Sequence, residues 1–427
     1  MFPTRRITTS GGDKFRDEFS LSFDGGNDFV NCGDSSDWNF SNGSASIFSV
    51  SVWFKSADGT PSANDTLISK YDTGTNKREW RISTDSNKRI IVYVSSNGSD
   101  ASSAYIPYVV DNTNWHNVVF VYNGSDATAD SRVILYVDGI NYATVVGSTL
   151  PAILNESDRA LTIGAYTSSG SSHAEWHGNI SEAAIYNKAL SASEVKTLYN
   201  GREPYNHKEG VCSSNLQAWW RMGDGSSNNR KFLYVENSAS SAGSNIITSS
   251  TFDSDEDGWV EEPGGSNSVS RVTDIASHSG SAGVLKAKCT NASSQYFAGT
   301  SAITSGMESG KIYVAEAYVY IPSSWSGTQN IYINAEGSFG ETGQSLGRIE
   351  NNVAVASIKD QWQHIFTTFL CGEDSGSGNF YLRAIATDNL EVDDFIYLDD
   401  FKLTEIDKPN SGIVLKTTQS AFEGDTP

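Results

Sequence analysis

The densest run of possible metal ligands is the acidic segment Asp253-Ser-Asp255-Glu-Asp257-Gly258. Carboxylates at alternate positions can converge on one hard cation, and a glycine directly after them permits a sharp turn. An EF-hand loop would also need Glu at its twelfth position, where this chain has Gly264, and flanking helices, which the local pattern does not predict. The segment therefore predicts a calcium loop of related geometry. A solvated acidic loop is the alternative.

A second possible chemistry is the stacking of sugar rings on aromatic side chains. In residues 309–322 one face of a predicted strand has Ala315, Ala317 and Val319, and the other face has an acidic residue and two tyrosines. Two further aromatic residues follow at the next turn and strand. The predicted sugar-binding residues are Glu316, Tyr318, Tyr320, Trp325 and Tyr332. The alternative is an ordinary polar outer face.

Catalytic motifs find little support. The six histidines form no HExxH motif, and no GxSxG, P-loop or dinucleotide-binding glycine motif has the required context. A retaining glycosidase needs two carboxylates about 5 Å apart. A compact Glu-x-Asp-x-Glu strand could supply them, but the closest run, residues 391–395, has the wrong spacing. The sequence therefore predicts a protein that is not an enzyme.

Composition narrows the class of protein further. The 427 residues carry a formal net charge of −21, which argues against nucleic acid or anionic lipid as the main partner. No apolar stretch is long enough for membrane insertion, and the polar N-terminus has no apolar core typical of a secretory signal. The four cysteines form no CxxC pair, so we expect buried free thiols.

The elements that would position these residues are mostly strands. Residues 48–56 alternate with period two, and residues 115–124 are apolar on both faces, as in a central strand. Residues 132–146 predict a hairpin that turns at Asp138-Gly139. Polar turns between short strands indicate antiparallel sandwiches.

One short helix is predicted at 192–200. Ser191 and Glu194 form a capping box, Leu190 and Val195 occupy the positions of a hydrophobic staple, and Gly201 follows as a left-handed cap.

The first part of the chain resembles the laminin-G-like, concanavalin A-like jelly-roll family. The similar segments are LSFDGGNDFVNCG (21–33), FSVSVWFKS (48–56), TLISKYD (66–72), WHNVVFVYNGS (115–125), ILYVDG (134–139), LTIGAY (161–166) and GNISEAAIYNKALSASEVKTLYN (178–200). The resemblance implies a fold but no particular ligand, because this fold carries many functions. LQAWWRMGDG (216–225) looks like the opening strand of a further, incomplete module of this family.

Residues 245–406 resemble the jelly-roll carbohydrate-binding modules of xylanases and cellulases. The similar pieces are NIITSSTFDSDEDGW (245–259), SHSGSAGVLKA (277–287), SGKIYVAEAYVYIP (309–322), the strand at Trp362 and IYLDDFKL (396–403). This resemblance implies a structural calcium held by Asp253 and Asp399. The first resemblance implies another calcium near Asp24 and Glu182. Both resemblances assign the following residues to the cores: Trp53, Trp115, Trp176, Trp259 and Trp362.

The expected fold is therefore all-β, with two antiparallel jelly rolls in tandem and one short helix closing the first. The expected division is an N-terminal docking arm (1–17), the first jelly roll (18–205), a connector with a vestigial strand (206–244), the second jelly roll (245–406) and a C-terminal tail (407–427) that is mobile or ordered by a partner.

The N-terminal segment running into the first strand looks like the start of bacteriophage virion surface and fibre proteins. That likeness implies a virion-surface location, with a cell surface as the alternative, and a homo-oligomer, taken as a trimer. A basic cluster, Arg5, Arg6, Lys14 and Arg16, is expected to dock on other virion proteins. The jelly rolls would then bind host or environmental glycans. The alternatives are a purely structural decoration, a polysaccharide depolymerase and a bacterial adhesion module.

Overall fold

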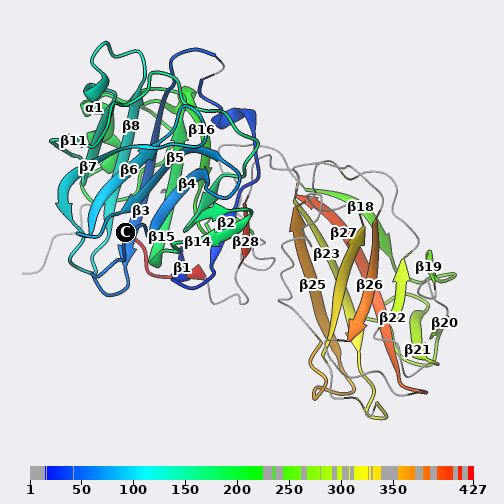
Figure 1. The fold of residues 1–427 in the computed structure, drawn as a ribbon. Coiled ribbons are helices and arrows are strands. Elements are labelled where there is room, and N and C mark those ends of the chain that lie inside the picture. The colour runs from blue at the N-terminus through cyan, green and yellow to red at the C-terminus, as the bar shows by residue number, and fades with distance from the viewer. Residues whose placement is uncertain are drawn as a thin grey trace, which may run out of the picture.

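The computed structural model shows two β-sandwiches (Figure 1). The residues that it describes are 15, 17–41, 43–224, 234–235, 244–260, 267–278, 280–290, 296–300, 307, 312–325, 327, 330–337, 354–370, 378–384, 392–406, 412–415 and 422–427. The all-β expectation is confirmed, because nearly all regular structure in these residues is antiparallel strand.

One sheet of the first jelly roll has the strand order β10-β9-β8-β3-β15-β1-β29, and β16 lies beside the second half of β15. The bounds are β1 Ser20–Asp24, β3 Ile47–Ser56, β8 His116–Asn123, β9 Val133–Val137, β10 Ile140–Tyr142, β15 His177–Tyr186, β16 Leu216–Trp220 and β29 Phe422–Glu423. Residues 115–124 therefore contribute a central strand, as predicted, since β8 pairs with both β3 and β9.

The facing sheet has the order β11-β7-β6-β5-β4-β12-β2-β28-β17, with the hairpin β13-β14 beside β4. The bounds are β2 Phe29–Asn31, β4 Thr66–Asp72, β5 Lys77–Thr84, β6 Arg89–Val94, β7 Ser102–Val109, β11 Val145–Val146, β12 Thr162–Ile163, β13 Tyr166–Ser168, β14 Ser171–His173, β17 Tyr234–Val235 and β28 Gly412–Leu415. Short 3-10 turns lie at Ser36–Trp38, Ala129–Ser131 and Ser213–Asn215.

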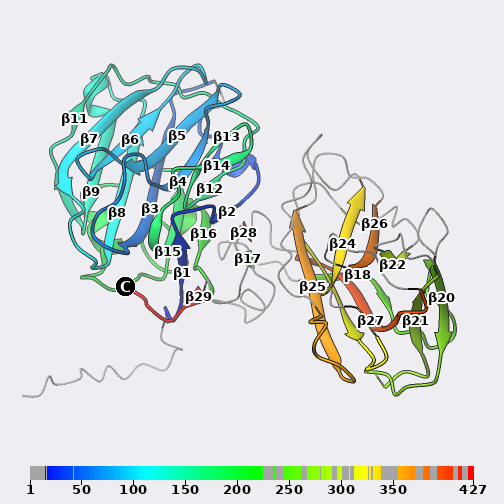
Figure 2. The same ribbon diagram turned by 60° about the horizontal axis from the view of Figure 1, so that its bottom comes forward.

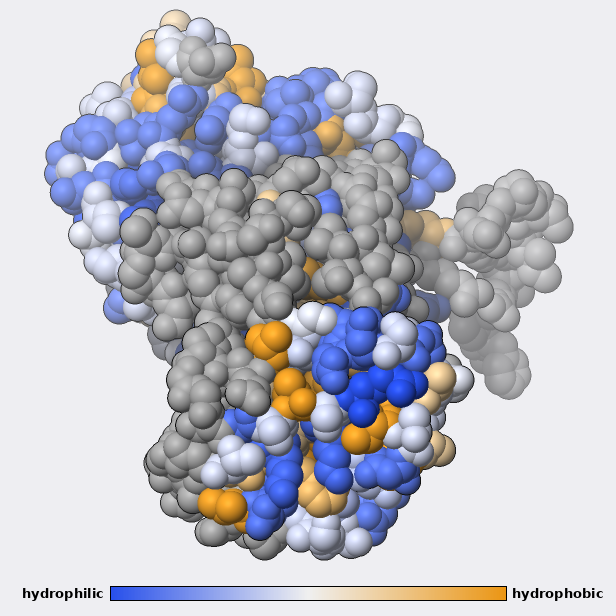
Figure 3. Space-filling view, turned by 90° about the vertical axis from the view of Figure 1, so that its right-hand side faces the viewer, coloured by the Kyte–Doolittle hydropathy of each residue, from blue (hydrophilic) through white to orange (hydrophobic). Residues whose placement is uncertain are grey.

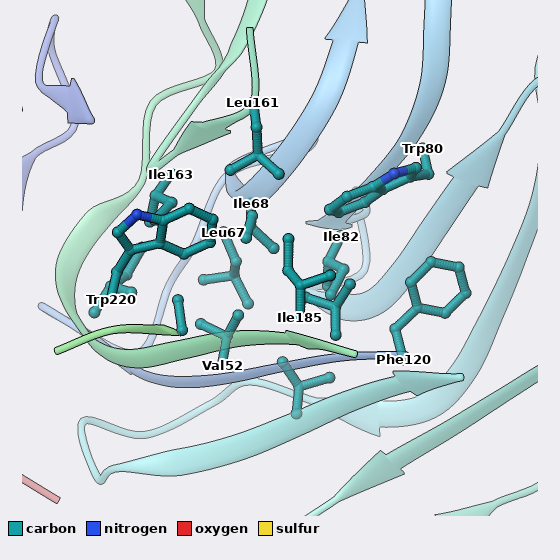
Figure 4. Packing of buried hydrophobic residues seen from close by; sticks show 14 of the residues in the cluster. Val52, Leu67, Ile68, Trp80, Ile82, Phe120, Leu161, Ile163, Ile185 and Trp220 are labelled. Atoms are coloured by element: carbon teal, nitrogen blue, oxygen red, sulfur yellow. The ribbon is translucent and has the colours of Figure 1, made fainter. Parts of the chain in front are cut away.

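The core between these sheets follows from the period-two pattern. Val50, Val52 and Phe54 of β3 point inward, as their alternation predicts. Figure 4 shows Trp80 and Trp220 among the aliphatic side chains of this core. Trp220 belongs to β16, in the segment expected to be a connector. Residues 216–220 are thus a strand of the first jelly roll rather than part of a separate module.

Two local predictions are confirmed. Asp138 and Gly139 have φ values of 52° and 72°, which the tight turn between β9 and β10 requires. Helix α1 (Ala192–Tyr199) starts at the Ser191–Glu194 capping box, and Asn200 takes the left-handed cap conformation one residue before Gly201.

The second jelly roll also has two sheets. One has the order β20-β21-β27-β23-β25, with β18 beside β27, and the other has the order β19-β22-β26-β24. The bounds are β18 Ser244–Ser250, β19 Trp259–Val260, β20 Asn267–Val272, β21 Val284–Cys289, β22 Tyr296–Thr300, β23 Ile312–Tyr320, β24 Ile331–Gly337, β25 Trp362–Leu370, β26 Gly378–Ala384 and β27 Phe395–Ile406.

The C-terminal segment returns to the first jelly roll. Strand β28 pairs with β2 and β17, and β29 pairs with β1. Figure 2 shows β17 and β28 between the two sandwiches. Where the sequence predicts a tail at 407–427, the structure therefore has two short strands. The second jelly roll is inserted between β17 and β28 of the first one.

The two sandwiches also share apolar contacts. The buried cluster of the first jelly roll includes four residues of the second: Ile312, Val314, Phe366 and Ile406. They lie at one end of the sheet face that is turned away from the second core, and β25 contacts β28 there. Figure 3, viewed from the side of the second jelly roll, shows hydrophobic residues only in small patches among hydrophilic ones. Two valines of the second jelly roll, Val260 and Val392, are exposed, and single exposed residues of this type are ordinary on a protein surface.

Candidate functional site

In the second jelly roll, the outer face of the sheet that contains β23, β25 and β27 carries a group of aromatic side chains beyond its contact with the first jelly roll. Strand register places Tyr318 opposite His364 and Tyr320 opposite both Trp362 and Tyr397, so these side chains stand on the same side of β23, β25 and β27. The intervening residues of β23, such as Ala317 and Val319, fill the core. We call the surface formed by Tyr318, Tyr320, Trp362, His364 and Tyr397 the aromatic face.

One end of the aromatic face is built on an acid–imidazole pair. The His364 ring lies 2.7 Å from a Glu316 carboxylate oxygen and 4.9 Å, centroid to centroid, from Tyr318. His278, from the loop before β21, stacks on Tyr318 at 3.4 Å with an angle of 14° between the rings. Glu316 thus fixes His364, and the two imidazoles fix the phenol ring between them.

The other end groups three larger rings. Tyr320 lies 5.5 Å from Trp362 and 5.8 Å from Tyr397, both edge to face. The Trp362 indole N–H donates to the Ala276 carbonyl at 3.2 Å, which holds the indole against the loop. Tyr397 is buried, whereas Tyr320 and Trp362 are half-exposed. A sugar can therefore stack on rings that are already held in position.

Polar groups border these rings. The Tyr397 hydroxyl donates to Asp274 at 3.2 Å, and Lys286 lies 3.6 Å from the same carboxylate and 3.9 Å from the centre of the Phe395 ring. Burial, and then the Asp274 charge, raise the pKa of Tyr397 to about 12, so its hydroxyl remains a donor at neutral pH. The face thus combines apolar platforms with a carboxylate, an ammonium group and imidazoles.

Of the five predicted sugar-binding residues, two belong to this face, one lies directly beside it and two do not. Glu316, Tyr318 and Tyr320 lie together as predicted. Trp325 and Tyr332 are only 3 % and 4 % exposed, and the Trp325 ring packs in the second core, so neither can offer a sugar an open ring.

The sequence analysis also missed two members of the face, His364 and Tyr397, and misassigned a third member, Trp362. His364 and Tyr397 alternate with core residues on β25 and β27, a period-two signal that could have found them. Trp362 was expected in the core but is half-exposed, as is Trp115. Trp53, Trp176 and Trp259 are buried as expected.

The residues of the predicted calcium loop do not converge. One Asp253 oxygen accepts from the Ala282 N–H at 3.0 Å, Asp255 accepts from the Asp257 N–H, and Asp257 accepts from the Phe252 N–H. Asp399 is buried on β27 and accepts from the N–H of Asp400. Within the described residues these carboxylates do not form a group of three or more ligand atoms close enough to share one ion. A calcium held by fewer carboxylates, together with backbone oxygens, stays a prediction.

Asp24 and Glu182 are too far apart to share one calcium ion. Strands β1 and β15 pair Asp24 with His177, which lies five residues before Glu182. Glu182 instead lies in a buried acid cluster with Asp17 and Asp224, whose ligand-type oxygens lie within 4.8 Å of one another. The Arg221 Nε–H donates to Glu182 at 3.2 Å, and the Trp219 indole N–H also donates to Glu182. Burial, together with these like charges, raises the pKa of Asp17.

The predicted docking residues Arg5, Arg6, Lys14 and Arg16 lie outside the described residues. Nearby, Phe15 stacks on Trp219 at 5.8 Å, and Asp224 accepts from the backbone N–H groups of Glu18 and Phe19. Phe15 and Asp17 are thus attached to the first jelly roll, although they were expected in the arm.

Three of the cysteines are described and are free thiols, with Cys32 and Cys289 buried and Cys212 half-buried. No helix in the described part of the chain is long and apolar enough to cross a bilayer.

Comparison with known families supports both resemblances. Residues 24–196 match the concanavalin A-like lectin/glucanases superfamily, and residues 244–389 match a carbohydrate binding domain. The chain thus has a concanavalin A-like domain followed by a carbohydrate-binding domain. No curated protein matches the chain.

Solved structures give partial likenesses. A native heptameric SAP-like pentraxin from Limulus polyphemus is 16 % identical, with 43 % of this chain and 82 % of that chain covered and a TM-score of 0.31. The xylan-binding domain CBM22-1 of Paenibacillus barcinonensis Xyn10C is 14 % identical over 39 % of this chain and 97 % of that one, with a TM-score of 0.29. Likenesses at this level carry over no ligand.

Proposed function

We propose that the protein is a non-enzymatic glycan-binding protein and that the aromatic face of the second jelly roll is its binding site. The observation that carries this proposal is the set of half-exposed rings at Tyr318, Tyr320 and Trp362, held in position by neighbouring side chains on a domain that matches a carbohydrate-binding family. Apolar platforms with a few placed polar groups are what a pyranose ring needs.

The chemistry of binding follows from the side chains. The C–H face of a sugar stacks on the half-exposed rings, while its hydroxyls exchange hydrogen bonds with Glu316, His364 and Asp274. Because Ile312 and Val314 are buried at the other end of β23, the site is open only along the aromatic end of the sheet. Such contacts give weak binding per site, which several copies would strengthen.

A glycan array on the full chain tests the proposal. The resemblance to modules of xylanases and cellulases makes xylohexaose and cellohexaose the first probes. For these neutral probes we expect reproducible hits with the wild-type chain and none with the Tyr318→Ala/Trp362→Ala variant. A blank array from folded, multivalent protein would contradict glycan binding and favour the structural-decoration alternative.

The virion-surface setting suggested by the N-terminal segment, and calcium binding, remain predictions. Docking through the arm predicted at residues 1–17 implies loss of particle incorporation when that segment is deleted. Calcium predicts a lower melting temperature after addition of a chelator. The depolymerase alternative predicts the release of reducing ends from polysaccharide, which an assay on the same probes would detect.

A further inference from the structure

The first jelly roll contains a buried arginine that forms no ion pair with any carboxylate in the described part of the chain. Arg81 of β5 lies between the inward-facing Trp80 and Ile82, so its side chain is on the outer side of the sheet. It is nevertheless only 6 % exposed. One terminal nitrogen donates to the Asn64 side-chain carbonyl at 2.9 Å. The Nε and the other terminal nitrogen are buried and donate to no acceptor among the described residues.

Three tyrosines from three strands surround this guanidinium. Its central carbon lies 4.9 Å from the ring centre of Tyr71, 4.2 Å from that of Tyr93 and 4.4 Å from that of Tyr166. The rings attract the positive charge, but they do not accept its N–H groups in the plane of the guanidinium. The rings therefore stabilise the charge of Arg81 but leave two of its nitrogens without a hydrogen-bond acceptor among the described residues. We call Arg81 and these three rings the tyrosine cage.

Two lysines on this sheet are paired with carboxylates. Lys70 contacts Asp34 at 3.0 Å and Glu79 at 2.9 Å, and Lys77 pairs with Asp158. Arg78, 5.9 Å from the Tyr71 ring, donates only to backbone carbonyls within the described residues, and Arg81 forms no ion pair there. In a chain with a net charge of −21, Arg78 and Arg81 thus lie beside the same Tyr71 ring without a carboxylate partner among the described residues. An isolated buried charge is costly unless a partner satisfies it.

We propose that the tyrosine cage binds the carboxylate of an acidic sugar residue. The adjacent N–H groups of a guanidinium match a carboxylate in a two-pronged hydrogen bond. Tyr93 and Tyr166 are half-buried and offer ring edges on which the sugar can rest. Since the two free nitrogens are buried, one of the surrounding rings must move for the carboxylate to enter. This site is separate from the aromatic face.

The test uses the full chain and oligosaccharides that differ in charge. Trigalacturonic acid and sialyllactose are expected to bind, and the carboxyl-reduced trisaccharide and lactose are not. Arg81→Lys keeps the positive charge but loses the two parallel N–H donors of the guanidinium, and should weaken binding about tenfold or more. The matched control is Arg89→Lys, because Arg89 also lies over a tyrosine, 3.8 Å from the Tyr105 ring, but is already paired with Asp85 at 2.6 Å. That variant should bind like the wild type.

Two further measurements make the result decisive. Tyr318→Ala should leave trigalacturonate binding unchanged, which separates this site from the aromatic face. If Arg81→Lys does not fold, hydrogen exchange of the wild type should slow at 78–84 and 166–173 on addition of trigalacturonic acid, and should not change at 312–320. No binding, equal binding of a sulfated oligosaccharide that has no carboxylate, or unchanged affinity in folded Arg81→Lys would overturn the proposal.

Discussion

The aromatic residues of the second jelly roll have two roles: some pack in its core, and others lie on the aromatic face, where a sugar could stack on them. Trp325 and Tyr318 lie close in sequence, but the first is in the core and the second is on the aromatic face. Both are aromatic residues after a run of β-formers, so residue type alone cannot distinguish the two roles. The period-two position places Tyr318 correctly, whereas Trp325 follows β23 in a turn, where alternation does not apply.

This difference predicts opposite effects of two substitutions. Trp325→Ala should lower the free energy of unfolding of the second jelly roll by about 3–5 kcal/mol, because it leaves a cavity. Tyr318→Ala should cost only about 1 kcal/mol. Urea unfolding measures both values. An equal loss for the two variants would contradict the placement of Trp325 in the core.

The acid cluster gives a pH prediction at the same scale. Asp17 faces Glu182, Asp224 and Arg221, and burial followed by the charge of Glu182 raises the pKa of Asp17 from 3.8 to about 10. The folded state therefore holds a proton that the unfolded chain releases above about pH 4. Stability is fully present below that pH and declines as the pH rises toward 10.

Asp17→Asn should remove much of the loss of stability between about pH 4 and pH 10. Its carboxamide stays neutral, so we expect a higher melting temperature than the wild type at pH 9 and a smaller difference at pH 5. Asp37→Asn, at an exposed turn, is the control. If Asp17→Asn changed the melting temperature relative to the wild type by the same amount at pH 5 and at pH 9, Asp17 would not be the titrating group.

Among the elements, the long strands and the helix could be predicted, whereas the short C-terminal strands could not. Alternation over 48–56 and the capping box at Ser191 are local signals that the fold obeys. Strands β28 and β29 span only four and two residues, and their partners β1 and β2 lie almost 400 residues earlier. Pairing of this kind is decided by tertiary contacts and not by local propensity.

Shortening the C-terminus tests these strands. A chain ending at 421 loses the β1–β29 pairing and the contacts of Asp425 with Lys55 and Trp115, so its melting temperature should fall slightly. A chain ending at 411 also loses β28 and should melt clearly lower. Calorimetry would show the order, and an unchanged melting temperature for the shorter chain would instead indicate a tail that contributes nothing.

At the scale of the whole molecule, the insertion of one sandwich into the other ties the two together. The chain enters the second jelly roll after β17 and returns at β28, and these strands pair. The apolar contacts of Ile312, Val314, Phe366 and Ile406 reinforce that junction. Domains that share only small interfaces normally move relative to each other, so these contacts should restrict the motion.

Polar substitutions at the junction should release it. Ile312→Ser with Ile406→Ser is expected to increase the radius of gyration in X-ray scattering while leaving glycan binding in place, because these paired residues lie at the end of the sheet away from the aromatic face. Val260→Ser, at an exposed position, is the matched control. An unchanged radius of gyration would show that the pairing of β17 with β28 is enough to hold the two parts.

The most direct test of glycan binding by the aromatic face is a calorimetric titration of the full chain with xylohexaose or cellohexaose, whichever of these neutral probes binds more tightly on the array. The Tyr318→Ala/Trp362→Ala variant should bind about tenfold more weakly or worse, because two stacking rings are gone. Trp115→Ala, which removes a half-exposed indole from the first jelly roll, should bind like the wild type. Equal affinity of the folded double variant and the wild type would contradict the assignment of the site.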